Sequence, residues 1–102
     1  MTNVIGRIDD VVHQRVRLGI LTVLDELGEC DFNYLLEELE LTAGNLSRHL
    51  TVLDDAGYVI TQKTLEGSRP RTWIRLTQEG QIALQEEIQA LRELLKLGGG
   101  DE

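Results

Sequence analysis

Residues 41–59 read LTAGNLSRHLTVLDDAGYV. Three leucines in this stretch follow one another at spacings of four and three residues, which places them on one face of a helix. They are Leu46, Leu50 and Leu53. The hydroxyl group of Thr42 can cap the start of the helix, and Gly57 can end it in a left-handed backbone conformation. The stretch therefore predicts a helix between Thr42 and Gly57 with one buried face.

Two helices are predicted before this stretch. Apolar residues at helical spacing predict one over roughly 13–27, with Gly28 as its C-terminal cap. A shorter helix is predicted over about 32–39, with Asp31 as its N-cap. Only a few residues separate this short helix from the leucine-faced one, which is the arrangement of a helix-turn-helix unit. Farther upstream, the apolar residues of segment 4–12 favour a short amphipathic helix.

After the leucine-faced helix, apolar and polar residues alternate, as is typical of strands. Two such runs, 58–63 and 71–76, predict a β-hairpin with a long tip over about 64–70. With Ile60 paired near Ile74, we expect one apolar and one polar face. The apolar face would carry Tyr58, Ile60, Ile74 and Leu76. The other face would carry Thr61, Lys63, Arg71, Trp73 and Arg75.

A last helix is expected to begin at Thr77, whose side chain suits an N-cap. Its apolar residues form a seam with spacings of four, three and four, namely Leu84, Ile88, Leu91 and Leu95. The predicted fold class is mainly α with a small β-hairpin (α+β). We expect one domain over residues 1–97, with dimerisation through the N- and C-terminal helices at about 4–12 and 77–97. Residues 98–102 form a polar tail that we expect to be flexible.

The charge of the chain is unevenly distributed. The formal net charge is −8, which argues against a nucleic-acid partner when taken alone. Residues 19–43 contain seven acidic residues and no Lys or Arg. Residues 44–76 contain five Lys and Arg against three Asp and Glu, a net of +2. The positive charge thus lies in the leucine-faced helix and the hairpin, where it would favour contact with an anionic partner.

Four segments of the chain resemble a known family. They are HQRVRLGILTVL (13–24), DFNYLL (31–36), the stretch over 41–59, and GSRPRTWIRLTQEG (67–80). In this order they resemble winged helix-turn-helix transcriptional regulators of the MarR/ArsR type, and most closely their small single-domain members. The resemblance implies a homodimer that binds the double-stranded DNA of a promoter or operator. It implies no enzyme activity.

The second helix of a helix-turn-helix unit lies in the major groove, and the hairpin beside it can touch phosphates or the minor groove. Asn suits a bidentate contact with adenine and Arg one with guanine. A glycine lets the backbone approach DNA closely. We therefore predict that nine residues contact DNA. They are Thr42, Gly44, Asn45, Ser47, Arg48, Thr51, Lys63, Arg69 and Arg71.

Other side chains carry two interpretations. His49 is better explained as a packed residue than as a base contact, and Trp73 as a packing residue than as a base stacker. Arg15 and Arg17 could touch flanking phosphates or only keep the first helix hydrated. Cys30 fits a packed small residue better than a redox sensor, because the acidic residues beside it would raise the pKa of the thiol.

We predict no cofactor and no metal site, because the Cys and His residues lack metal-ligand spacing. The single cysteine and the absence of a long apolar run favour a cytoplasmic protein without a signal peptide or membrane span. One alternative is a winged-helix protein–protein interaction module that does not bind DNA, which the acidic total favours. A small-molecule effector is compatible with the first hypothesis and would sit between subunits.

Overall fold

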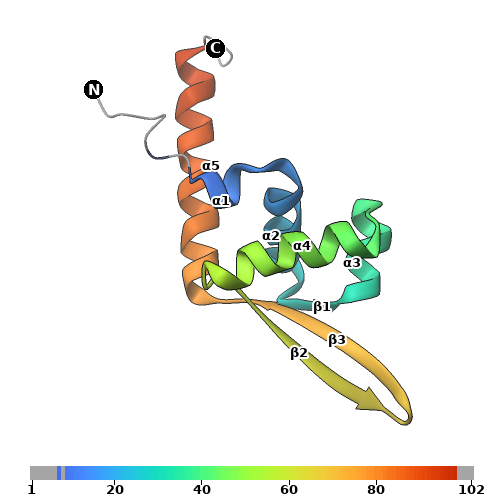
Figure 1. Cartoon of the computed structure of the whole chain (residues 1–102). Helices are drawn as coiled ribbons and strands as arrows, with labels where there is room; N and C mark the ends of the chain where they lie inside the picture. The colour runs from blue at the N-terminus through green and yellow to red at the C-terminus, as the bar shows by residue number, and fades with distance from the viewer. Residues whose placement is uncertain (1–6, 8, 99–102) are drawn as a thin grey trace.

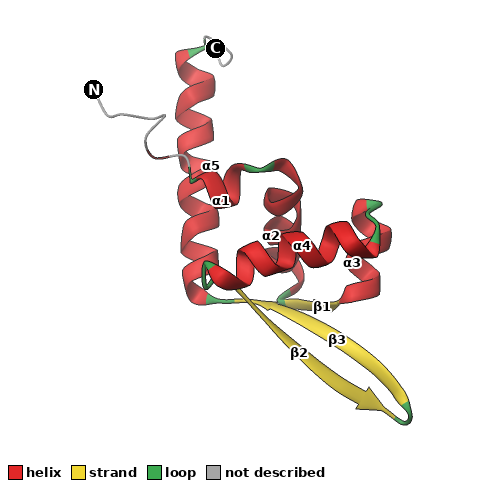
Figure 2. Cartoon of the chain, viewed as in Figure 1, coloured by secondary structure: helices red, strands yellow, loops and turns green. Residues whose placement is uncertain are grey.

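The computed structural model describes residue 7 and residues 9–98 (Figure 1). The helices lie to one side of a small sheet, and the long hairpin that forms most of this sheet projects away from them (Figure 2). The elements in chain order are α1 (Asp10–His13), α2 (Arg15–Leu27), β1 (Glu29–Asp31), α3 (Phe32–Leu39), α4 (Ala43–Asp55), β2 (Val59–Glu66), β3 (Arg69–Leu76) and α5 (Gln78–Leu97). The predicted class, mainly helical with a little antiparallel sheet, is confirmed.

Three helices begin where the sequence predicted, because a side-chain oxygen caps each of them. Asp31 accepts a hydrogen bond from the backbone N–H of Tyr34 at 2.8 Å. The Thr42 hydroxyl accepts one from Asn45 at 3.2 Å, and Thr77 caps the N–H of Gly80 at 2.9 Å. These bonds satisfy backbone donors that have no partner within the helix.

The predicted helix over 13–27 is interrupted near its start. The side-chain oxygen of Gln14 accepts hydrogen bonds from the N–H groups of Val16 and Arg17 at 2.8 and 3.1 Å, so α2 begins only at Arg15. His13 instead ends the four-residue helix α1. The helix predicted over 4–12 can be checked only in part, because residues 4–6 and 8 lie outside the described residues.

The sheet contains a strand that the sequence did not predict. Strand β1 pairs with β3, and the order in the sheet is β1-β3-β2 with antiparallel neighbours. Cys30 lies opposite Ile74 and is buried. The three residues of β1 are too few to give a periodic pattern, and they form a strand only because β3 supplies the partner.

The predicted hairpin is correct, but its register and tip are wrong. Thr61, not Ile60, lies opposite Ile74, and Ile60 lies opposite Arg75. Both strands run to a two-residue turn at residues 67 and 68, where Gly67 has a φ of 68°. A shift of one residue moves side chains to the other face of a sheet.

Two consequences for the faces follow from this register. The core-facing side is lined by Val59 and Ile74, whereas Ile60 is 42% exposed. Lys63 lies on the same face as these core residues, since it pairs with Thr72, and Arg71 lies on the opposite one. The expectation that Lys63 and Arg71 share a face is therefore wrong.

The core lies between the sheet and the helices. The predicted leucine face of α4 is confirmed, as Leu46, Leu50 and Leu53 are at most 5% exposed. Helix α5 packs on α1 and α2, and at Gly80 its first turn lies close to the backbone of Tyr58. A Cβ atom on Gly80 would overlap the carbonyl oxygen of Tyr58, which accepts a hydrogen bond from the N–H of Thr77.

We predict that Gly80→Ala lowers the free energy of unfolding by about 1–3 kcal/mol, because the added methyl group meets rigid backbone. Denaturant unfolding followed by circular dichroism measures the change. Gly44→Ala is the matched control, since a Cβ atom there would meet nothing within 4 Å. Equal stability of the Gly80→Ala protein and the unmodified protein would contradict the predicted overlap.

Candidate nucleic-acid interface

One side of α4 is free for a partner. The buried leucines fix the rotation of the helix, so the predicted positions Gly44, Asn45, Ser47, Arg48 and Thr51 are all exposed. The Arg48 guanidinium donates a hydrogen bond from Nη2 to the Asn45 side-chain oxygen at 3.0 Å. This contact presents an amide and a guanidinium side by side, the two groups best suited to base edges.

The two threonines of the predicted set already have hydrogen bonds. The Thr42 hydroxyl caps α4, and the Thr51 hydroxyl donates to the Ser47 carbonyl oxygen at 3.0 Å. Thr42 can therefore offer DNA only the remaining bonding capacity of its hydroxyl group. Gly44 lies in open space on the first turn, so its backbone is accessible to a large partner.

A groove separates α4 from the hairpin and the start of α3. Its volume is about 470 Å³, and it is lined on the α4 side by Ser47 and Thr51 and on the hairpin side by Lys63 and Thr72. The predicted residues Ser47, Thr51 and Lys63 are thus brought together around one groove. Asp54 also lines it, so the groove holds charges of both signs.

The three basic residues of the hairpin differ in their surroundings. Arg69 is exposed next to the turn, opposite Glu66, and Lys63 is exposed on the α4 side. Arg71 is instead held by two carboxylates, at 2.8 Å from Asp31 and 2.7 Å from Glu66. These hydrogen bonds, led by the one to Glu66, raise the pKa of the Arg71 guanidinium. Lys63 and Arg69 therefore extend into solvent, whereas Arg71 is already partnered.

Arg17 joins α1, α2 and α4. Its Nε donates to the Val11 carbonyl oxygen at 2.6 Å, and its Nη1 lies 3.3 Å from Nδ1 of His49. His49 is 8% exposed, and burial together with the charges of Arg17 and Arg48 lowers its pKa. His49 is therefore a packed residue, and Arg17 connects α2 to α1 and α4. The contact of Arg17 with His49 joins residues 32 positions apart in the sequence, which no local pattern indicates.

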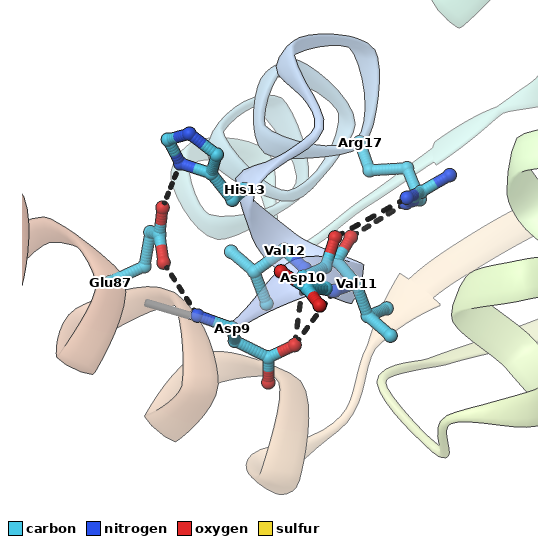
Figure 3. A network of polar contacts seen from close by, with 7 residues as sticks. All are labelled: Asp9, Asp10, Val11, Val12, His13, Arg17 and Glu87. Atoms are coloured by element: carbon cyan, nitrogen blue, oxygen red, sulfur yellow. Dashed lines mark hydrogen bonds and ion pairs between the residues drawn. The ribbon is translucent and has the colours of Figure 1, made fainter. Parts of the chain in front are cut away.

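A second polar network joins α1 to α5 (Figure 3). The Glu87 side chain is fully buried and accepts from the N–H of Asp9 at 3.2 Å, and its other oxygen lies 2.7 Å from Nδ1 of His13. The Asp9 carboxylate caps α1 and accepts from the Tyr58 hydroxyl at 2.8 Å. That hydrogen bond, together with burial and the charges of Asp9 and Glu86, raises the pKa of Tyr58 to about 12. The sequence analysis did not single out Glu87. It is one of several acidic residues in α5, and the sequence alone does not distinguish it from those that face solvent.

Fold and site together define a class of protein. A helix-turn-helix pair, α3 and α4, is followed directly by a hairpin wing, and the exposed side of α4 carries polar groups suited to base edges. This is the architecture of a winged helix-turn-helix protein.

A family model described as a winged helix DNA-binding domain matches residues 16–95, so the chain belongs to that family. The resemblance to winged helix-turn-helix transcriptional regulators is confirmed, and the family is one of DNA-binding regulators, not of enzymes. Within the described residues, no helix combines the length and apolar character needed to cross a membrane. Among the same residues, no group of three or more His, Cys, Asp or Glu is arranged to hold a metal ion.

Three known proteins illustrate the similarity. An uncharacterized protein of Methanocaldococcus jannaschii is 42% identical over 81 residues, covering 79% of this chain and 88% of that protein. The structure of a transcriptional regulator homologue from Pyrococcus horikoshii has a TM-score of 0.81 at 32% identity, covering 90% and 89% of the two chains. A MarR-family putative regulator from Enterococcus faecalis has a TM-score of 0.70 at 22% identity, covering 87% and 79%, and shares the fold.

Cys30 is predicted to react slowly with thiol reagents. Burial, followed by the charges of Asp31 and Glu29, raises its pKa to about 11. At pH 8 only about a thousandth of such a thiol is ionised, against about a quarter of an ordinary one. We expect labelling by a disulfide reagent to be at least about a hundredfold slower in the folded protein than in guanidinium chloride. Similar rates in both conditions would exclude a packed role for Cys30.

Proposed function

We propose that the protein is a homodimeric regulator of transcription that binds operator DNA in the cytoplasm. Helix α4 enters the major groove, and the wing, formed by β2 and β3, lies on the backbone or in the minor groove. The observation that carries this proposal is the exposed Asn45–Arg48 pair on α4, bonded at 3.0 Å beside the wing. Its position in a winged helix DNA-binding domain supports a role in reading bases.

The proposed contacts divide into two kinds. Asn45 and Arg48 read base edges, while the hydroxyl groups of Ser47 and Thr51 reach bases or phosphates. The open surface at Gly44 lets the first turn of α4 approach the DNA backbone closely. Lys63 and Arg69 neutralise phosphates from the wing, which supplies affinity without sequence information.

We propose that residues 1–97 form a single domain, and that its dimer contacts come from segments 4–12 and 77–97. The 20-residue helix α5 extends well past the rest of the fold in Figure 1. Its exposed apolar side chains include Leu95 and Leu97, at 66% and 58% exposure. We propose that a second copy of α5 covers them. Two modules on DNA would also double the number of contacts, with half-sites one helical turn apart.

Arg48→Ala is predicted to weaken binding to a cognate duplex by about 1–3 kcal/mol, because it removes a bidentate base contact. The duplex is obtained by selection from random DNA with the unmodified protein, at two salt concentrations. Arg69→Ala should weaken binding about equally for all sequences and reduce the salt dependence. Arg92→Ala, an exposed arginine on α5, is the control.

Two outcomes would count against this docking. Unchanged affinity of the Arg48→Ala, Arg69→Ala double variant would show that α4 and the wing do not meet DNA as proposed. The absence of any enriched sequence at low salt would favour the alternative, a winged-helix module that binds protein partners. An enriched inverted repeat would support both the DNA-binding function and the two-fold symmetry of the dimer.

Leu95→Glu is predicted to shift the protein from dimer toward monomer, because it places a charge in the proposed apolar contact between α5 helices. Sedimentation velocity over a range of concentrations measures the shift. Leu27→Glu is the matched control, since Leu27 is 49% exposed at the end of α2, outside the proposed interface. A dimer that survives Leu95→Glu unchanged, or an unmodified protein that is monomeric, would contradict the α5 contact.

A further inference from the structure

The guanidinium of Arg71 contacts three different parts of the fold. Its Nε and Nη2 both lie 2.8 Å from Oδ2 of Asp31, and its Nη1 donates to Glu66 Oε1 at 2.7 Å. It also lies over the ring of Trp73, with 4.6 Å between the guanidinium carbon and the ring centroid. Arginine is suited to such a site, since its planar fork binds carboxylates and its face stacks on aromatic rings.

We propose that Arg71 is a positioning residue that fixes the angle of the wing relative to the helix-turn-helix unit, and is not a ligand of DNA phosphate. This proposal rests on the proposed DNA-binding function. It changes the role predicted for Arg71 and leaves the phosphate contacts of the wing to Lys63 and Arg69.

The place of Arg71 in the sheet explains why the wing needs such a contact. Strand β1 supports β3 only as far as the pair Asp31–Trp73. Beyond Trp73 the wing continues as two strands only, and Arg71 pairs with Thr64 in this unsupported part. A two-stranded ribbon alone is only marginally stable and twists readily. Arg71 therefore holds the wing just past the point where the third strand ends.

The partner carboxylate connects the wing to the DNA-reading helices. Oδ1 of Asp31 caps α3 by accepting from the N–H of Tyr34, and Oδ2 binds Arg71. One side chain thus joins the start of the helix-turn-helix unit to the wing. Only 13% of the Asp31 side chain is accessible, whereas 41% of the Arg71 side chain is, so solvent screens this ion pair mainly from the Arg71 side.

A positioning role and a phosphate-binding role predict opposite effects at Asp31. If Arg71 bound phosphate, Asp31 would compete for it, and Asp31→Asn would strengthen DNA binding. If Arg71 positions the wing, Asp31→Asn weakens binding although it removes a negative charge from a DNA-binding face. Asn is a good N-cap, so this substitution keeps the cap of α3 and changes mainly the contact with Arg71.

The experiment measures affinity for the duplex selected by the unmodified protein. We expect Arg71→Gln and Asp31→Asn each to weaken binding about threefold to tenfold, and the double variant to be no weaker than Arg71→Gln, because that substitution already removes the contact with Asp31. Arg71→Lys should not restore binding, since lysine cannot make the forked and stacked contacts. The control is Arg75→Gln, an exposed arginine on the same face of β3. Tighter binding by Asp31→Asn, additive effects, or full rescue by lysine would overturn the proposal.

A measurement without DNA separates this proposal from the proposed function. Trp73 is the only tryptophan of the chain, so its emission reports on the Arg71 contact. We expect Arg71→Gln and Asp31→Asn to shift this emission and to speed amide hydrogen exchange at Thr64 and Leu65, whereas Arg75→Gln does neither. Unchanged emission and exchange would overturn the positioning role. Failure of the unmodified protein to select any duplex would instead overturn the proposed function and leave this result intact.

Discussion

The burial of the leucine face of α4 is the constraint on which the rest of the structure depends. With Leu46, Leu50 and Leu53 in the core, the helix has only one rotation about its axis, and its polar side chains other than the packed His49 face solvent. The same core also fixes the start of β2, because Val59, two residues after Gly57, is buried in the cluster that contains these leucines. The placement of the base of the wing relative to the exposed face of α4 thus follows from apolar packing.

Local signals made the helices predictable, and the sheet depended on contacts that are not local. Spacing of apolar residues and the capping side chains of Asp31, Thr42 and Thr77 lie within a few residues of the elements that they define. The register of β2 against β3 and the pairing of β1 were set by partners far along the chain. An alternating pattern carries no information on which of two adjacent registers is used unless one face is clearly apolar.

The candidate site also contains some features that local sequence signals predict and others that depend on contacts between distant residues. The exposed positions on α4 follow from the periodicity of the helix, and the structure brings several of them together around the groove beside Lys63. The ion pair of Arg71 with Asp31 and the contact of the buried Glu87 with His13 required the tertiary fold, because these partners lie 40 and 74 residues apart in the sequence. Acidic residues therefore have structural roles inside a protein whose net charge of −8 suggested only repulsion of DNA.

Because the turn of the wing is tight, the length of the two strands determines how far the tip of the wing reaches from α4. Because β2 and β3 are paired up to the two residues of the turn, an insertion in both strands would lengthen the ribbon without opening it. Each added residue pair extends the reach by about 3.3 Å and reverses the face on which the tip side chains lie. Only insertions of an even number of pairs would carry the charge of Arg69 farther from α4 while keeping it on the same face.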